Sequence, residues 1–258
     1  MAQLINGEVV GKVGEMTFYP ANGKIIVRTA SNKKNKTKTE GQFRQLMHFL
    51  NLNQLWGVMK QTERVYFEGT KSSAQRQFLH VNNSLPHIYL PEWKNRKRTA
   101  VLQPGMVVSD GSLPSFDYQL GEFQGEPALL TTLVESDAQN GELLLYVFQQ
   151  IEEMEEMKIP SIRTKVIEIN KPTDEVKIAF RNGCLVLSGS MFADDMSGFA
   201  LVRVVDGHAS RQTLVTHCTY YQQFTADEAL MTAAESYGKV KKCNIDEWYV
   251  KLKNRQTK

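Results

Sequence analysis

Residues 11–42 have the sequence GKVGEMTFYPANGKIIVRTASNKKNKTKTEGQ, and the interpretation of the chain starts from this stretch. Asn22-Gly23 separates two runs rich in β-branched and aromatic residues, EMTFY and KIIVRT. An Asn-Gly pair suits the type I′ turn of a tight hairpin, because both central residues of that turn have positive φ. The stretch therefore predicts an N-terminal β-hairpin, with Gly11 and Gly14 at a bend or bulge where the hairpin leaves the preceding segment.

A polar connector follows the hairpin and leads into a long helix. Thr39-Glu-Gly-Gln42 matches a capping box, in which the first and last side chains satisfy amides at a helix start. Apolar residues then recur at spacings of three and four from Phe43 to Trp56, as on one face of a helix. We predict a helix over residues 40–60.

From residue 101 onward, short apolar runs alternate with turn signals. Asn140-Gly141, Asn182-Gly183 and Asp206-Gly207 each lie between two such runs, which indicates antiparallel hairpins. About nine strands at this spacing predict an immunoglobulin-like β-sandwich, with ELLLYVFQ as its best central strand. A second capping box begins at Thr225 and predicts a short helix that Gly238 ends. The expected fold is mainly β within the α+β class.

Three segments follow from this pattern. Residues 1–36 are expected to form a β-hairpin arm and a basic linker, and residues 37–100 a helical segment. Residues 101–258 are expected to form the β-sandwich domain, with the short helix and a basic tail at its end.

Composition restricts the class of protein. The 258 residues are 41% hydrophobic and 23% charged with a net charge of +3, as in an ordinary globular protein. Three cysteines at wide spacings do not predict a disulfide framework. No apolar run approaches the roughly 20 residues of a membrane span. The first residues lack the pattern of a signal peptide, so we expect synthesis in the cytoplasm.

Motifs that carry chemistry are missing from the sequence. The five histidines form no HExxH pattern, the cysteines form no CxxC pattern, and no serine lies in a nucleophile elbow. Gly11-x-x-Gly14 lacks the Lys-Ser/Thr ending of a phosphate-binding loop. We therefore expect a non-enzymatic protein with no catalytic residues, no cofactor and no metal.

The hairpin and the connector each allow two interpretations. The hairpin either folds back on its own sandwich or pairs with a sheet edge of a neighbouring subunit. In the second case Arg28 could pair with a partner's carboxylate, and the glycines would set the geometry. The expected interaction residues are Gly11, Gly14, Phe18, Tyr19, Gly23, Ile25, Ile26, Val27 and Arg28. The connector is either a solvated linker or a contact to nucleic acid through Lys33, Lys34, Lys36 and Lys38.

The order of these motifs resembles an uncharacterised family of proteins found in Bacteroidota and their phages. That family shows G-K-x-G, a V-x-R ending of the hairpin, T-E-x-Q on the helix, an S-x-G-x-L-P element and a β-rich C-terminal half. The resemblance covers most of residues 7–115 and, more loosely, residues 175–220. It departs at the helix near residues 225–237 and at the basic tail. The matching positions are Gly11, Lys12, Gly14, Arg28, Thr39, Glu40, Gln42, Gly111, Leu113 and Pro114.

The hairpin, linker and helix also resemble the start of some phage virion proteins. The resemblance implies a structural protein of a phage or prophage virion, in a head–tail connector or neck ring, a tail or a capsid auxiliary position. Its partners would be further copies of itself and other virion proteins, without a membrane. Two alternatives stay open: a nucleic-acid-binding accessory protein that uses the lysines and the basic tail, and an adhesion or carbohydrate-binding β-sandwich.

Overall fold

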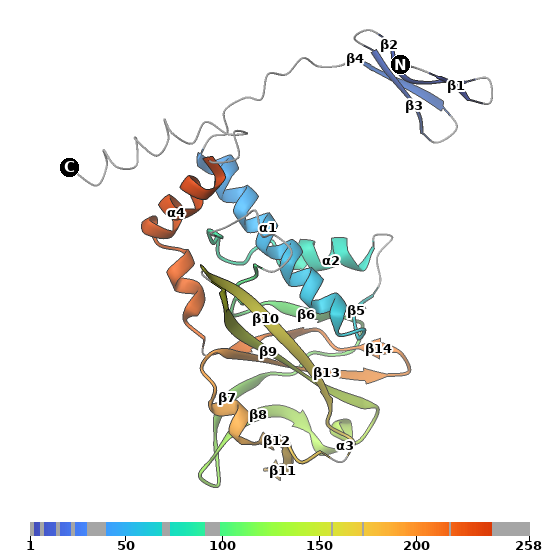
Figure 1. The fold of residues 1–258 in the computed structure, drawn as a ribbon. Coiled ribbons are helices and arrows are strands. Elements are labelled where there is room, and N and C mark those ends of the chain that lie inside the picture. Colours follow the sequence, from blue (N-terminus) through green and yellow to red (C-terminus); the bar gives the residue numbers. More distant parts are fainter. Residues whose placement is uncertain are drawn as a thin grey trace. The chain divides into compact units, whose positions relative to one another are not determined.

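The structure is a computed structural model, and it divides the chain into two compact units, residues 1–37 and 38–258. We call them the N-terminal unit and the body. Figure 1 shows the elements of both. The described residues are 3–5, 8–13, 16–21, 24–29, 40–68, 73–90, 99–155, 157–171, 173–216 and 218–238.

The N-terminal unit contains a four-stranded antiparallel sheet in the order β1-β2-β3-β4. The predicted hairpin is confirmed, with Phe18 opposite Val27 and Tyr19 opposite Ile26. Two further strands, which no sequence signal predicted, precede it. The bounds are β1 Gln3–Ile5, β2 Glu8–Val13, β3 Met16–Ala21 and β4 Lys24–Thr29.

The prediction of a mainly β fold with a few helices is confirmed. The body contains two larger antiparallel sheets, in the orders β11-β12-β8-β7 and β10-β9-β13-β14, with β16 also on β13. Their strands are β7 Tyr118–Phe123, β8 Glu126–Val134, β9 Glu142–Glu155, β10 Met157–Glu168, β11 Lys177–Arg181, β12 Cys184–Ser188, β13 Ser197–Val205, β14 His208–Ala209 and β16 Val215–Thr216.

A shared apolar core holds these two sheets face to face. Leu129 and Leu187 of one sheet lie in the same buried cluster as Leu145, Phe199 and Leu201 of the other. Successive side chains of a strand point to opposite faces, so Leu144, Tyr146 and Phe148 of β9 point the other way.

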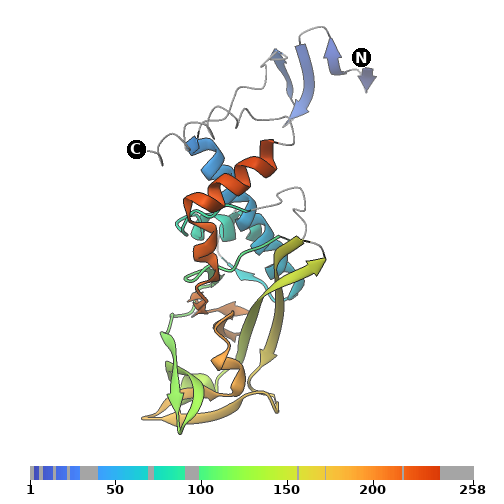
Figure 2. The same cartoon turned by 60° about the vertical axis from the view of Figure 1, so that its left-hand side comes forward.

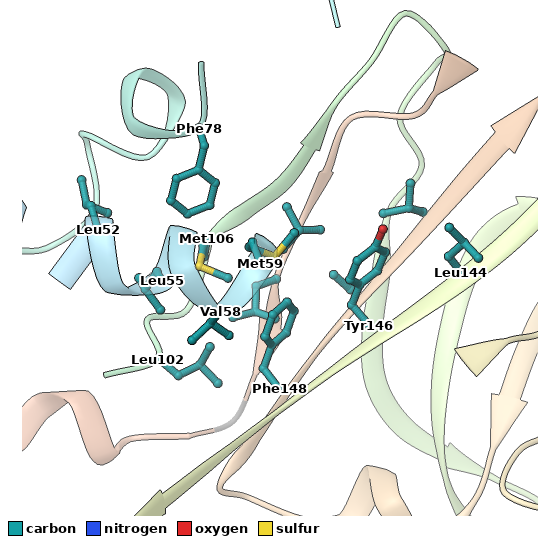
Figure 3. Packing of buried hydrophobic residues seen from close by; sticks show 14 of the residues in the cluster. Leu52, Leu55, Val58, Met59, Phe78, Leu102, Met106, Leu144, Tyr146 and Phe148 are labelled. Atoms are coloured by element: carbon teal, nitrogen blue, oxygen red, sulfur yellow. The ribbon is translucent and has the colours of Figure 1, made fainter. Parts of the chain in front are cut away.

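Helices cover that second face of the β10-β9-β13 sheet. Leu55 and Met59 of helix α1 (Glu40–Gln61) and Phe78 of helix α2 (Ala74–Val81) lie in one buried cluster with Tyr146 and Phe148. Figure 3 shows this cluster. The prediction of a long helix from residue 40 is confirmed. Because both faces of the sheet are buried, β9 and β13 are nearly continuous in apolar residues.

The remaining elements complete the helical side. A small sheet in the order β15-β6-β5 lies on the same core. The predicted C-terminal helix is confirmed as α4, which crosses α1 near its N-terminal end (Figures 1 and 2). No helix in the described ranges is long and apolar enough to cross a bilayer. The bounds are β5 Tyr66–Phe67, β6 Val107–Asp110, β15 Gln212–Thr213, α3 Glu135–Ala138, α4 Asp227–Gly238, η2 Ser190–Ala193 and η3 Tyr220–Phe224.

Several local predictions need revision. Thr219 precedes the 3-10 helix η3, which begins with Tyr220 and Tyr221. Thr225, predicted to begin the capping box of the last helix, lies at the C-terminal end of η3, and its hydroxyl donates to the carbonyl of Gln222. Asn140-Gly141 follows α3 and does not join two strands directly. The capping residue Thr39 lies outside the described residues.

The other turn predictions are confirmed by the backbone. Asn182-Gly183 and Asp206-Gly207 both have positive φ at the two positions, 50° and 77° in the first and 50° and 81° in the second. These are the left-handed conformations that a type I′ hairpin turn requires. They join β11 to β12 and β13 to β14.

A buried loop lies between one part of α1 and the central sheet. Residues 99–103 have no regular structure, yet each is at most 2% exposed. The predicted boundary near residue 100 falls in this loop, and the helical and β segments share the core around it. Backbone groups buried without water need partners of their own.

Side-chain carboxamides supply many of these partners. Asn51 of α1 donates to the carbonyl of Val101 and accepts from its amide, both at 3.0 Å. Gln150 of β9 accepts from the Leu102 amide at 2.8 Å. It also donates to the carbonyls of Ala100 at 3.1 Å and Ser161 at 2.8 Å. Asn82 binds both backbone groups of Val107.

Replacement of Gln150 tests the role of these carboxamides. Gln150→Met keeps the side-chain length but leaves three buried backbone groups without their partner. We expect the free energy of unfolding to fall by about 3 kcal/mol. The matched control is Gln149→Met on the adjacent, exposed residue. It should change that free energy by less than about 0.5 kcal/mol in urea denaturation. Equal losses in the two variants would contradict this account.

Candidate functional site: an exposed sheet face and a polar cluster

The two faces of the β3–β4 hairpin differ in chemistry. The strand register places Met16, Phe18, Ile25 and Val27 on one face, which we call the apolar face together with Pro20 and Thr29. None of these six side chains is charged. The apolar face is also exposed, with Met16 at 52%, Ile25 at 40% and Val27 at 51% of full accessibility.

The opposite face carries the charges of the hairpin. Lys24, Ile26 and Arg28 of β4 lie there beside Thr17 and Tyr19 of β3. The guanidinium carbon of Arg28 lies 5.6 Å from the centre of the Tyr19 ring, a cation–π contact. Arg28 therefore has a partner within its own hairpin, whereas the sequence analysis proposed a carboxylate of another subunit.

Of the predicted interaction glycines and connector lysines, only Gly11 is among the residues that the structure describes. Gly11 lies in β2 opposite Phe18 with φ of 115°, a conformation that favours glycine. Gly14, Gly23 and the connector lysines Lys33, Lys34, Lys36 and Lys38 lie outside the described residues.

A polar cluster on the body was not predicted. Glu68 Oε2 lies 3.0 Å from Ser112 Oγ and 3.0 Å from His208 Nδ1, and Ser112 Oγ lies 3.1 Å from the same nitrogen. The Ala209 amide donates to Glu68 Oε1. We call Glu68, Ser112 and His208 the Glu68 cluster. It lines a surface hollow of about 560 Å³ together with Gly111 and Gly207.

The geometry of the cluster differs from that of a catalytic triad. In a triad the imidazole contacts the nucleophile through one nitrogen and the carboxylate through the other. Here Ser112 and Glu68 both contact Nδ1 of His208. This histidine is thus not placed to take the Ser112 proton on one nitrogen while the carboxylate holds the other.

The cluster instead joins three segments of the body. Glu68 follows β5, Ser112 follows β6, and His208 begins β14. The Leu113 amide donates to the Ala209 carbonyl at 3.0 Å. A Cβ atom on Gly111 would lie 1.8 Å from that carbonyl oxygen, so this position requires glycine. The S-x-G-x-L-P element therefore docks along residues 208–210.

The environment of Glu68 changes its titration. Partial burial by itself raises the pKa of the carboxyl, but hydrogen bonds from His208, the Ala209 amide and Ser112 outweigh it and hold the pKa below its ordinary value. A carboxylate whose pKa is lower in the folded state stabilises the fold above the unfolded-state pKa, about 4.3. That stabilisation is lost as pH falls through the folded-state pKa.

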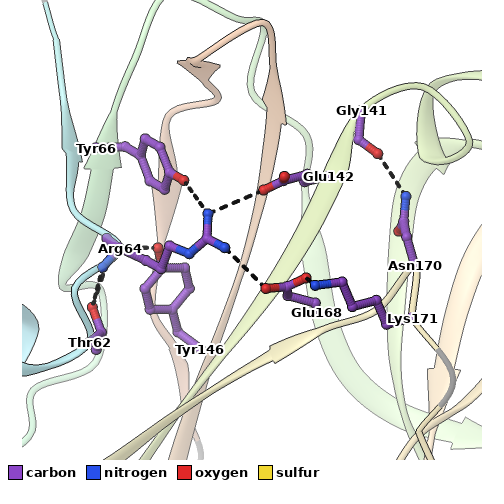
Figure 4. Close-up of polar contacts among 9 residues, drawn as sticks. All are labelled: Thr62, Arg64, Tyr66, Gly141, Glu142, Tyr146, Glu168, Asn170 and Lys171. Atoms are coloured by element: carbon purple, nitrogen blue, oxygen red, sulfur yellow. Dashed lines mark hydrogen bonds and ion pairs between the residues drawn. The ribbon is translucent and has the colours of Figure 1, made fainter.

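A second polar group lies where α1 ends (Figure 4). The Arg64 guanidinium lies 3.1 Å from Glu168 at the end of β10 and 3.4 Å from Glu142 at the start of β9. The hydroxyl of buried Tyr146 donates to the Arg64 carbonyl at 2.7 Å. Arg64 is 40% exposed, so its ion pairs contribute about 1 kcal/mol or less each. We interpret this group as a joint between α1 and the sheet.

A pair of rings joins buried His48 of α1 to His87, which is exposed. His48 Nε2 lies 3.2 Å from the Asn83 carbonyl, and its ring stacks on His87 at 4.7 Å. Burial, and then the neighbouring His87, lower the pKa of His48, so it is neutral at pH 7. Within the described ranges, no three His, Cys, Asp or Glu side chains gather in a way that could hold a metal ion.

A further apolar surface lies at the β11 edge of the body. Ile178 and Phe180 are 47% and 38% exposed. With Leu143, Ile169 and Leu185 they line a cavity of about 340 Å³ at the mouth of the sandwich. Lys177 of the same strand pairs with Glu126.

None of the family models, curated proteins and solved structures compared with the chain matches it.

Replacement of Glu68 tests the cluster as a pH-dependent joint. Glu68→Gln removes the charge and should lower the free energy of unfolding at pH 7 by about 1 kcal/mol. The difference from the wild type should shrink as pH falls from the unfolded-state pKa, about 4.3, through the lower folded-state pKa, because the wild-type carboxylate is progressively protonated over that range. Urea denaturation from pH 7 to pH 3 measures it, with Glu122→Gln, an exposed glutamate on β7, as control. A loss that is the same at every pH would contradict this role.

Proposed function

We propose that the chain is a non-enzymatic assembly subunit of a phage or prophage particle, which contacts neighbouring subunits through its N-terminal unit. The observation that carries the proposal is the exposed, uncharged face of the β3–β4 hairpin, on a compact unit distinct from the body. Partners would be further copies of the chain and other particle proteins.

Physical chemistry favours a binding role for this face. A sheet becomes stable by burying one face against a second layer, and a hairpin by itself is marginal in water. Contiguous exposed apolar side chains mark interaction sites on soluble proteins. Met16, Ile25 and Val27 are among the most exposed large apolar side chains of the described chain.

The body is suited to serve as a frame. If β7 to β14 are named A, B, C, C′, D, E, F and G in chain order, the sheets have the orders A-B-E-D and C′-C-F-G. Immunoglobulin-type sandwiches have the same orders. This agreement supports the immunoglobulin-like class for the body. β9 is buried on both faces, by the core that the two sheets share on one side and by the cluster with the helices on the other.

The choice of a phage particle rests on the sequence resemblance, and the structure gives one of its motifs a mechanical meaning. Gly111 and Leu113 of the S-x-G-x-L-P element contact the backbone of Ala209. The shared contacts of Ser112 and Glu68 on one nitrogen of His208 support the non-enzymatic part of the proposal.

Removal of the N-terminal unit tests the proposal. We compare the full chain with a chain of residues 38–258 by light scattering after size exclusion, over a wide range of concentrations. We expect the full chain to form oligomers as concentration rises and the shortened chain to stay monomeric. Circular dichroism checks that the shortened chain keeps its fold. Identical masses for the two folded chains at every concentration would contradict the proposal.

A further inference from the structure

The N-terminal unit is too small to stabilise itself by a core of its own. It has 37 residues, and chains below about 40 residues usually need a disulfide, a metal or association to fold. Its segment contains neither cysteine nor histidine, because the cysteines are Cys184, Cys218 and Cys243 and the first histidine is His48. Contact with another surface, on the body or on a second copy, is therefore the remaining route to a stable sheet.

The two faces of the hairpin differ in what they can associate with. The face with Lys24 and Arg28 carries two positive charges, so a second copy of that face would meet like charges. The apolar face carries no charge among its described side chains. Two copies of the apolar face can meet about a two-fold axis without repulsion, and each supplies the second layer that the other lacks.

We propose that the apolar face of β3 and β4 packs against the same face of a second copy, so that two N-terminal units form one two-layer sandwich. This inference rests on the proposed function and names the partner surface. Met16, Phe18, Ile25 and Val27 of each copy form the interior of the sandwich. Ile26, Tyr19 and Arg28 stay on its outer surfaces.

Adjacent residues of β4 provide a matched pair of variants. Val27 and Ile26 are neighbours and are 51% and 38% exposed, but they lie on opposite faces. In the full chain, Val27→Lys places a charge in the interface and should weaken self-association by more than about tenfold. Ile26→Lys should change it by less than about twofold. Sedimentation equilibrium of both variants and the wild type measures the association constants.

Photo-crosslinking gives a readout that does not depend on the stability of the variants. A benzophenone amino acid at position 27 should link to residues 16–29 of a second copy, as mapped by mass spectrometry of isotopically mixed chains. The same group at position 26 should give no such link. Links from position 27 to the body, within one copy or between copies, would overturn the inference.

The outcomes separate this inference from the proposed function. If both lysine variants associate like the wild type, while the chain of residues 38–258 stays monomeric, contact through the apolar face is wrong and the unit binds by another surface, such as the edge of β4. If Ile26→Lys alone disrupts association, the opposite face is the interface and the inference is wrong. If the chain of residues 38–258 associates like the full chain, the proposed function fails as well.

Discussion

The body depends on hydrogen bonds that satisfy an irregular loop in its interior. Residues 99–103 run between α1 and the central sheet and are almost fully buried. A loop in that position carries peptide groups that water cannot reach. Asn51 from the helix above and Gln150 from the strand below pair with its backbone as a neighbouring strand would. The helices and the sheets are joined through this loop.

This constraint explains the one polar interruption in the core of the central strand. β9 is apolar from Leu143 to Phe148 because both faces of its sheet are covered. Gln150 is 3% exposed, and it lies where the loop requires donors and an acceptor. An apolar residue there would fit the sheet but would leave the loop unpaired. β6 follows this loop in the chain, and Asn82 at the end of α2 binds both backbone groups of its Val107.

Short sequence signals predicted the elements whose conformation depends on residues close together in the chain. The Asn182-Gly183 and Asp206-Gly207 turns, the β3–β4 hairpin and helix α1 all follow from signals within a few residues. Gln124-Gly125 adopts the same left-handed pair of conformations, φ 53° and 79°, without the asparagine or aspartate that would have marked it. The carboxamide pairs and the Glu68 cluster were missed, because their partners lie far apart in sequence. The contact of Glu68 with His208 spans 140 residues.

The central sheet of the body is buried on both faces, whereas the N-terminal unit is a single sheet whose apolar face is exposed. If the proposed pairing of apolar faces is right, the order of this unit must depend on another copy. Hydrogen exchange of the full chain at increasing protein concentration tests this requirement most directly. We predict that protection of the β3 and β4 amides rises with concentration, while that of the β9 amides stays constant. Protection of β3 and β4 that is independent of concentration would contradict the account.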